Sequence, residues 1–122
     1  MKLRFDHQSI RLRVRKSDIE KLLQQGFILE TVHFPSGFLT YKLEISRSID
    51  AVSTKIEEDT ITVFLPADHA TEWIQSDNVG IYATLPTTAD EIFLRVLVEK
   101  DFPCRHNTSE DNADTFEELS RP

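Results

Sequence analysis

Short runs in which apolar and polar residues alternate restrict the fold of this chain more than any other feature. Side chains of a β-strand point alternately to its two faces, so such a run predicts a strand with one buried face. In residues 10–15, Ile10, Leu12 and Val14 alternate with three arginines. Comparable strands are predicted at 27–34, 38–45, 51–56, 60–65, 79–85 and 92–98. A turn at residues 36–37 is expected to join the first two of these into a hairpin.

Two segments depart from this alternation and predict short helices. Ser17 and Glu20 have the spacing of a capping box, apolar residues then recur at helical intervals, and Gly26 is expected to end the helix. Pro66 is suited to the start of the second helix, in which Trp73 belongs to an apolar stripe. Many short strands with two isolated helices predict an α+β domain.

The two helical segments lie in stretches that can be compared as repeats. Residues 9–35 and 60–86 align without a gap, strand on strand and helix on helix, with three identical positions. Chance supplies about as many identities, so the repeat depends on the matching apolar pattern. If the repeat is real, the chain consists of two interlocked strand–helix–strand–strand units whose backbones superpose. In either case we expect one α+β domain at residues 1–104, with a mostly antiparallel sheet or barrel of six to eight strands.

The composition changes after Val98, where acidic residues, Asn, Ser and Pro dominate and the apolar period is lost. Segments of this composition bury too little apolar surface to offset the entropy cost of ordering. We therefore expect residues 105–122 to form an acidic, flexible tail. Phe102 and Phe116 are the positions that could anchor parts of it.

The whole chain is acidic, since 21 Asp and Glu residues against 14 Lys and Arg give a net charge of −7 over 122 residues. Such a surface repels a phosphate backbone, so no nucleic-acid partner is expected. No apolar run approaches the roughly 20 residues that cross a bilayer, and the first residues resemble no signal peptide, so no membrane partner is expected. The single cysteine, Cys104, cannot form an internal disulfide, which favours a cytoplasmic location.

The arginines of residues 10–15 are the strongest candidate for a binding surface. On one strand face, Arg11, Arg13 and Arg15 form a predicted stripe about 13 Å long, and guanidinium groups suit planar contact with carboxylate or phosphate. We expect a carboxylate of the same sheet to neutralise it, with these candidates: Glu30, Glu44, Glu57 or Glu99. The alternatives are an anionic protein segment, a small anionic ligand, or the acidic residues 110–118 of the chain itself.

A second pattern lies near the C-terminus. LVEKDFPC at 97–104 is followed by EDNADTF at 110–116, and SIRLRVRKSDIEKL stands earlier, at 9–22. Together these segments resemble a family of small bacterial proteins classed as a domain of unknown function, and the resemblance implies no activity. Residues 61–83 are also similar to the strand–LP–helix–strand element of swapped-hairpin, cradle-loop barrels.

The C-terminal pattern supplies the remaining candidate binding residues: Glu99, Lys100, Asp101, Phe102 and Cys104. Glu99 and Asp101 could perform acid–base chemistry only if their environments separated their pKa values, and the sequence gives no sign of that. Cys104 and His106 could bind zinc or form a nucleophilic pair, but a structural zinc needs four ligands and alternate residues of an extended chain point apart. No metal site, cofactor or catalytic residue is therefore predicted.

The sequence also contains none of the common catalytic or phosphate-binding motifs, and its three glycines are too few for a glycine-rich loop. The aromatic residues Phe64, Trp73 and Tyr82 could line a ligand pocket, but such residues more often belong to the core, where we expect them. The favoured function is a non-catalytic binding or protein-interaction module. The alternative is a small enzyme or metal-binding protein that uses the cluster Glu99, Asp101, Cys104 and His106, and enzymatic activity is left open.

Overall fold

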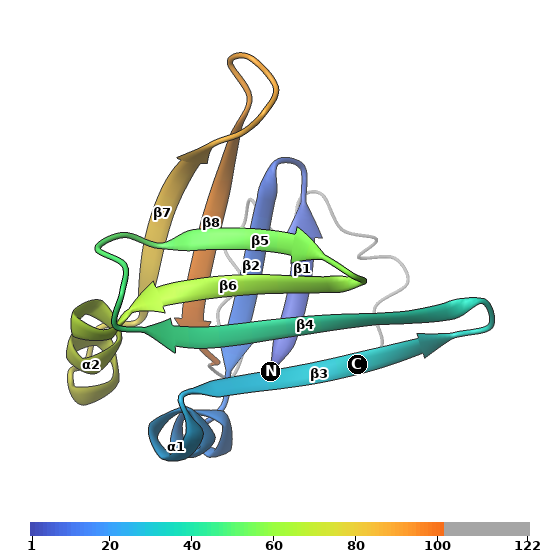
Figure 1. Cartoon of the computed structure of the whole chain (residues 1–122). Coiled ribbons are helices and arrows are strands. Elements are labelled where there is room, and N and C mark those ends of the chain that lie inside the picture. The colour runs from blue at the N-terminus through green and yellow to red at the C-terminus, as the bar shows by residue number, and fades with distance from the viewer. Residues whose placement is uncertain (102–122) are drawn as a thin grey trace, which may run out of the picture.

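The computed structural model describes residues 1–101, which form eight strands and two helices (Figure 1). The strands are β1 (Lys2–Asp6), β2 (Ser9–Val14), β3 (Phe27–Phe34), β4 (Gly37–Ser46), β5 (Ser53–Glu57), β6 (Thr60–Pro66), β7 (Gly80–Pro86) and β8 (Phe93–Lys100). The helices are α1 (Lys16–Gln25) and α2 (Ala67–Gln75). Neither helix reaches the length and apolarity that a membrane span requires. The predicted α+β class is confirmed.

The strands form two four-stranded sheets. Sheet A has the order β1-β2-β8-β7, and sheet B has the order β5-β6-β4-β3. In each sheet two antiparallel hairpins meet along one central parallel pair, β2–β8 or β4–β6. The mostly antiparallel pairing agrees with the prediction. The single sheet or barrel was wrong, because no outer strand of sheet A pairs with an outer strand of sheet B within residues 1–101.

The hairpins are exchanged between the two halves of the chain. Sheet A combines the first hairpin, β1–β2, with the last, β7–β8, whereas sheet B combines β3–β4 with β5–β6. Each helix carries the chain from the central strand of one sheet to the edge of the other, and the strands of the two sheets cross (Figure 1). Both halves therefore have the same element order and the same pairings. Superposition of residues 9–35 on 60–86 stays the test of the predicted repeat.

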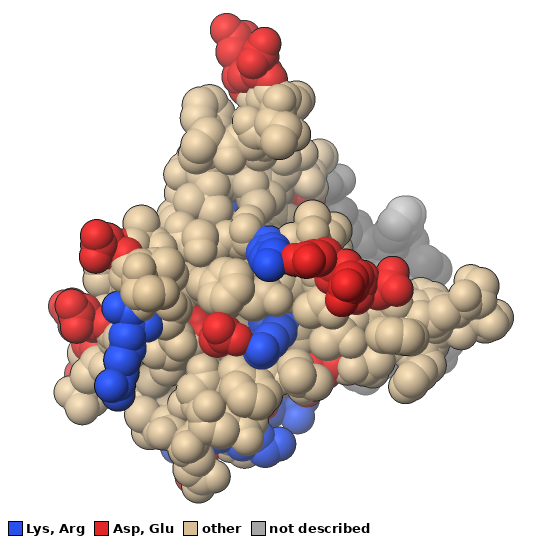
Figure 2. Space-filling model, in the orientation of Figure 1, with Lys and Arg blue, Asp and Glu red and all other residues tan. Residues whose placement is uncertain are grey.

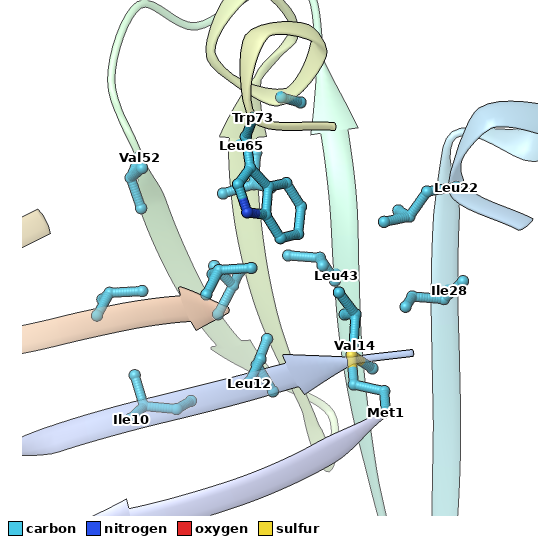
Figure 3. Packing of buried hydrophobic residues seen from close by; sticks show 14 residues of the cluster. Met1, Ile10, Leu12, Val14, Leu22, Ile28, Leu43, Val52, Leu65 and Trp73 are labelled. Carbon is cyan, nitrogen blue, oxygen red and sulfur yellow. The ribbon is translucent and has the colours of Figure 1, made fainter. Parts of the chain in front are cut away.

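The core lies between the two sheets and is closed by the helices (Figure 3). Its buried strand residues are Ile10, Leu12 and Val14 of β2, Leu43 of β4, Val63 and Leu65 of β6, and Val96 and Val98 of β8. Trp73 of α2 is 1% exposed, as predicted, and its indole N–H donates to the carbonyl oxygen of Val79 at 3.0 Å. The core assignment of Phe64 and Tyr82 was wrong. Both residues alternate with inward-facing neighbours on their strands and so lie on outer faces.

Helix α1 begins earlier than the predicted capping box, and this changes the arginine stripe. The backbone N–H of Arg15 donates to Oδ2 of Asp18 at 2.9 Å, so Asp18 takes the role expected of Glu20. Strand β2 consequently ends at Val14 and carries two of the three arginines. Gly26 ends the helix as predicted, with a left-handed φ of 84° and an N–H that donates to the carbonyl oxygen of Leu22.

The amino group of Met1 joins β1 to the rest of the fold. It lies 3.0 Å from Oδ2 of Asp18 and 3.1 Å from Oε1 of Glu30. The hydroxyl of Tyr41 donates to Oε2 of Glu30 at 2.6 Å. Burial alone raises the pKa of Asp18, but the Arg15 N–H and the Met1 amino group lower that pKa by more. Burial and the adjacent Glu30 raise the pKa of Tyr41 to about 12.

Candidate functional site

The outer face of sheet A gathers most of the candidate residues. The strand register places twelve side chains on it in three rows, each of which runs across β1, β2, β8 and β7. The rows are Lys2-Arg13-Glu99-Gly80, Arg4-Arg11-Leu97-Tyr82 and Asp6-Ser9-Arg95-Thr84. We call these twelve residues the arginine face. The intervening residues point inward because side chains alternate along a strand, and this fixes which residues share the face.

Positive charge dominates the arginine face. It carries these basic side chains: Lys2, Arg4, Arg11, Arg13 and Arg95, against the acids Asp6 and Glu99. Asp101, just beyond β8, contributes one further carboxylate, whose Oδ2 lies 3.1 Å from Nζ of Lys2. In a chain of net charge −7, this face therefore remains locally basic.

Glu99 is the centre of a charged network on this face. Its Oε1 lies 3.0 Å from Nε of Arg11 and 3.7 Å from Nε of Arg13, and its Oε2 accepts a hydrogen bond of 2.8 Å from the hydroxyl of Tyr82. Arg11 Nε and Glu99 Oε1 are fully covered and are not aligned for a hydrogen bond with any described group, so their contact is an ion pair. Of the four carboxylates proposed to neutralise the arginines, Glu99 does so.

Gly80 makes room for this network. A Cβ atom at position 80 would lie 2.6 Å from the carbonyl oxygen of Val98 and 2.9 Å from the hydroxyl oxygen of Tyr82. Contacts this short force the backbone or Tyr82 to move. Glycine at this position therefore allows Tyr82 to lean across β7 and β8 and reach Glu99.

Tyr82 acts in this network as a hydrogen-bond donor. Partial burial of its hydroxyl, the hydrogen bond to Glu99 and the negative charge of Glu99 together raise the pKa of Tyr82 above its usual value. A phenol with a raised pKa is protonated near neutral pH. Tyr82 is therefore not suited to act as a base or a nucleophile there.

Two adjoining hollows lie at the third row of the arginine face. One, of about 380 Å³, is lined by residues 82–84 of β7 and 95–97 of β8. The other, of about 410 Å³, lies beside the β1–β2 turn and also contacts Thr84 and Arg95. Arg95 is exposed and has no ion pair with any group of residues 1–101. Its guanidinium is thus available to an anion that enters either hollow.

The outer face of sheet B is differently charged. Its hollow of about 350 Å³ is lined by Lys42, Glu44, Lys55 and Glu57 with neighbouring threonines. Nζ of Lys42 lies 2.8 Å from Glu44, and Nζ of Lys55 lies 2.6 Å from Glu57. Figure 2 views this side of the molecule and shows basic and acidic side chains next to each other. Each cation here has its own carboxylate, so sheet B offers no comparable site for an anion.

The other predicted site residues have different positions. Arg15 is exposed at the start of α1, outside the strand. Lys100 donates from Nζ to the carbonyl oxygen of Ser76 at 2.7 Å, and therefore holds the end of α2. Phe102, Cys104 and His106 lie outside the described residues. Within residues 1–101, no three His, Cys, Asp or Glu side chains form a group that could hold a metal ion.

Sequence reasoning missed several members of the arginine face. Lys2 and Arg4 belong to β1, which was not predicted, although Lys2, Arg4 and Asp6 alternate there with Leu3 and Phe5. That alternation is the signal that could have found them. Arg95 lies on a strand that was predicted, but nothing local shows that it shares a face with Arg11. That proximity depends on the parallel pairing of β2 with β8.

Comparison with known proteins places the chain in a family without assigning an activity. A family model described as a family of unknown function (DUF7009) matches residues 1–120, so the chain belongs to that family. The suspected membership of a domain of unknown function is thereby confirmed. No curated protein and no solved structure matches the chain.

Proposed function

We propose that this member of the family is a non-catalytic binding module whose arginine face binds an acidic segment of another protein. The single observation that carries the proposal is the exposed Arg95 between two open hollows, on a face that is basic within an acidic chain. Guanidinium groups bind carboxylates through planar, charge-assisted hydrogen bonds.

The shape of the face favours an extended segment over a small ligand. Four strands span about 14 Å, and three rows span about 13 Å, so the cations are spread over more area than one phosphate or carboxylate group covers. Small-ligand sites are usually concave and bury most of their ligand. Both hollows beside Arg95 are open to solvent, and an extended peptide can place successive carboxylates in them.

The charges already paired on the face set its expected binding mode. Arg11 and Arg13 share Glu99, and Lys2 binds Asp101, so Arg95 and Arg4 are the cations with the most capacity left. Among residues 1–101, Asp6 is the one acid within ion-pair distance of Arg4, with 4.0 Å between Nη2 and Oδ2. Exposed ion pairs contribute about 0–1 kcal/mol each, so several must act together and binding must weaken as salt rises.

The test compares two charge reversals with the same change in net charge. Arg95→Glu lies on the arginine face, whereas Arg47→Glu lies in the exposed β4–β5 loop. A fluorescein-labelled peptide of alternating Glu and Gly is the probe, and fluorescence anisotropy gives its Kd. We expect Arg95→Glu to weaken binding about five- to ten-fold and Arg47→Glu to change it less than two-fold.

Three results would overturn the proposal. Equal losses in both variants would mean that only net charge matters. Failure of the peptide to bind the wild-type chain would remove the acidic segment as partner. Full displacement of the peptide by equimolar tripolyphosphate would assign the face to a small anion instead.

A further inference from the structure

We infer that residues 110–118 of the same chain occupy the arginine face, so that an external acidic partner must displace them. This inference rests on the proposed function, because it assigns a second, intramolecular occupant to the same face. Four observations support it: the place where the described chain ends, the length of chain beyond that point, its charge, and the apolar middle of the face.

The described chain ends beside the arginine face. Asp101 forms an ion pair of 3.1 Å with Lys2, which is in the first row of the face. The N–H of Asp101 donates to the carbonyl oxygen of Val14 at 2.8 Å, so the backbone of residue 101 is held to the end of β2. The following residues therefore start at the edge of the basic surface, and no detour around the molecule is needed to reach it.

The chain beyond Asp101 is long enough to cover the face. Residue 110 is nine positions beyond residue 101, and a flexible chain of nine steps spans about 15–18 Å on average. The face measures about 14 Å by 13 Å from strand spacings. Residue 110 can therefore lie over any of its three rows, and residues 110–118 add enough length to cross it.

The charge of residues 110–118 complements that of the face. The segment EDNADTFEE holds these acids: Glu110, Asp111, Asp114, Glu117 and Glu118, and it holds no Lys or Arg. The face provides Arg4 on the edge strand β1 and Arg95 on the central strand β8, both with spare capacity, and the partly exposed Arg11 and Arg13 on β2. Acids distributed along the whole segment suit cations distributed across the whole face.

An aromatic residue within the acidic segment matches the middle of the face. Leu97 and Tyr82 are neighbours in the second row, and Tyr82 is 55% exposed. Phe116 is the only aromatic residue among 110–118. A ring packed on Tyr82 and Leu97 buries apolar surface in the middle row of the face, toward its β7 edge.

Attachment to the same chain raises the local concentration of the segment. Short flexible linkers give effective concentrations in the millimolar range, so even a weak contact is populated. If the effective concentration is about four times the Kd of the free segment, an external peptide should bind about five-fold more weakly to the intact chain than to a chain whose segment lacks charge.

The experiment uses three full-length proteins and one probe. The probe is a fluorescein-labelled synthetic peptide with the sequence EDNADTFEE. The first protein is the wild-type chain, and the second carries the neutralising substitutions E110Q, D111N, D114N, E117Q and E118Q. The third carries the matched control set of exposed acids away from the face, E20Q, D50N, E72Q, D77N and D90N, with the same change in net charge.

We expect the probe to bind the segment-neutralised chain about five-fold more tightly than the wild type, and the control chain less than two-fold more tightly. Equal affinity for the wild-type and segment-neutralised chains would overturn self-occupancy and leave the proposed function intact. Equal gains in the segment-neutralised and control chains would assign the effect to net charge and also overturn it. Failure of the probe to bind any of the three would instead overturn the arginine face as a site for acidic segments.

Discussion

The two sheets of this protein are built from the same pairings, yet their outer faces differ in chemistry. Strand β2 of sheet A corresponds to strand β6 of sheet B, because each belongs to the central parallel pair of its sheet. In this correspondence, Arg11 matches Thr62. Arg13 likewise corresponds to Phe64, whereas the partner positions Glu99 and Glu44 are both glutamates. Each sheet thus has a glutamate at this position, and sheet A has two additional guanidinium groups around its glutamate.

This difference separates what the fold requires from what it leaves free. Inner positions must be apolar in both sheets, and the matching residues are Ile10 and Ile61, Leu12 and Val63, and Val14 and Leu65. Outer positions have no such constraint, because either a charged or a hydroxyl side chain can face water. A concentration of arginines on one sheet alone is therefore better explained by a role of that face than by folding.

The largest expected difference between the two sheets concerns one glycine in each of the hairpins β3–β4 and β7–β8. Gly80→Ala should destabilise the protein by about 2–3 kcal/mol, because the new methyl group meets a backbone carbonyl at 2.6 Å. Gly37→Ala, at the start of β4, meets nothing within 4 Å and should change stability by about 0.5 kcal/mol or less. Urea unfolding of both variants measures the difference. Equal effects would show that the space at Gly80 has no special importance.

A smaller effect is expected from the two corresponding glutamates. Glu99→Gln leaves Arg11 and Arg13 without their carboxylate and should cost about 1–2 kcal/mol. Glu44→Gln removes only a more exposed pair with Lys42 and should cost about 0–0.5 kcal/mol. Unfolding free energies from urea titration provide the comparison. A loss at Glu44 as large as that at Glu99 would contradict the special character of the arginine face.

The same glutamates show how far sequence could predict the site. Four carboxylates were equal candidates to neutralise the arginines, and three of them turn out to lie in sheet B. Glu30 binds Met1 and Tyr41, Glu44 binds Lys42, and Glu57 binds Lys55. Only the parallel pairing of β2 with β8 selects Glu99. That pairing joins residues more than eighty positions apart, and local periodicity carries no information about it.

The fold itself was more accessible where local turn signals delimit an element. The predicted boundaries of the strands at 27–34 and 38–45 agree with β3 and β4 to within one residue, because Gly26 ends α1 just before β3 and the turn at 36–37 separates the two strands. The split into two sheets was missed, since alternation determines which side of a strand is buried and says nothing of its neighbours. The third arginine was misplaced because Asp18 caps α1 at Arg15, two residues before the predicted start at Ser17.

The smallest predicted effect compares the two tyrosines of the chain, one in each sheet. Tyr82 and Tyr41 both donate to a glutamate, and both have raised pKa values, that of Tyr41 reaching about 12. Because the folded state holds these protons more tightly than the unfolded state, the stabilisation is complete below the unfolded pKa of about 10 and is lost as pH rises through the folded pKa values. Absorbance at 295 nm should therefore show much less than half of the tyrosine ionised at about pH 10.

Two variants assign the effect to each tyrosine. Glu99→Gln should lower the pKa of Tyr82 and leave that of Tyr41 unchanged, since Glu30 is in the other sheet. Tyr82→Phe identifies which transition belongs to which residue. Half ionisation of the wild-type protein at about pH 10 would show that neither carboxylate holds its tyrosine in solution.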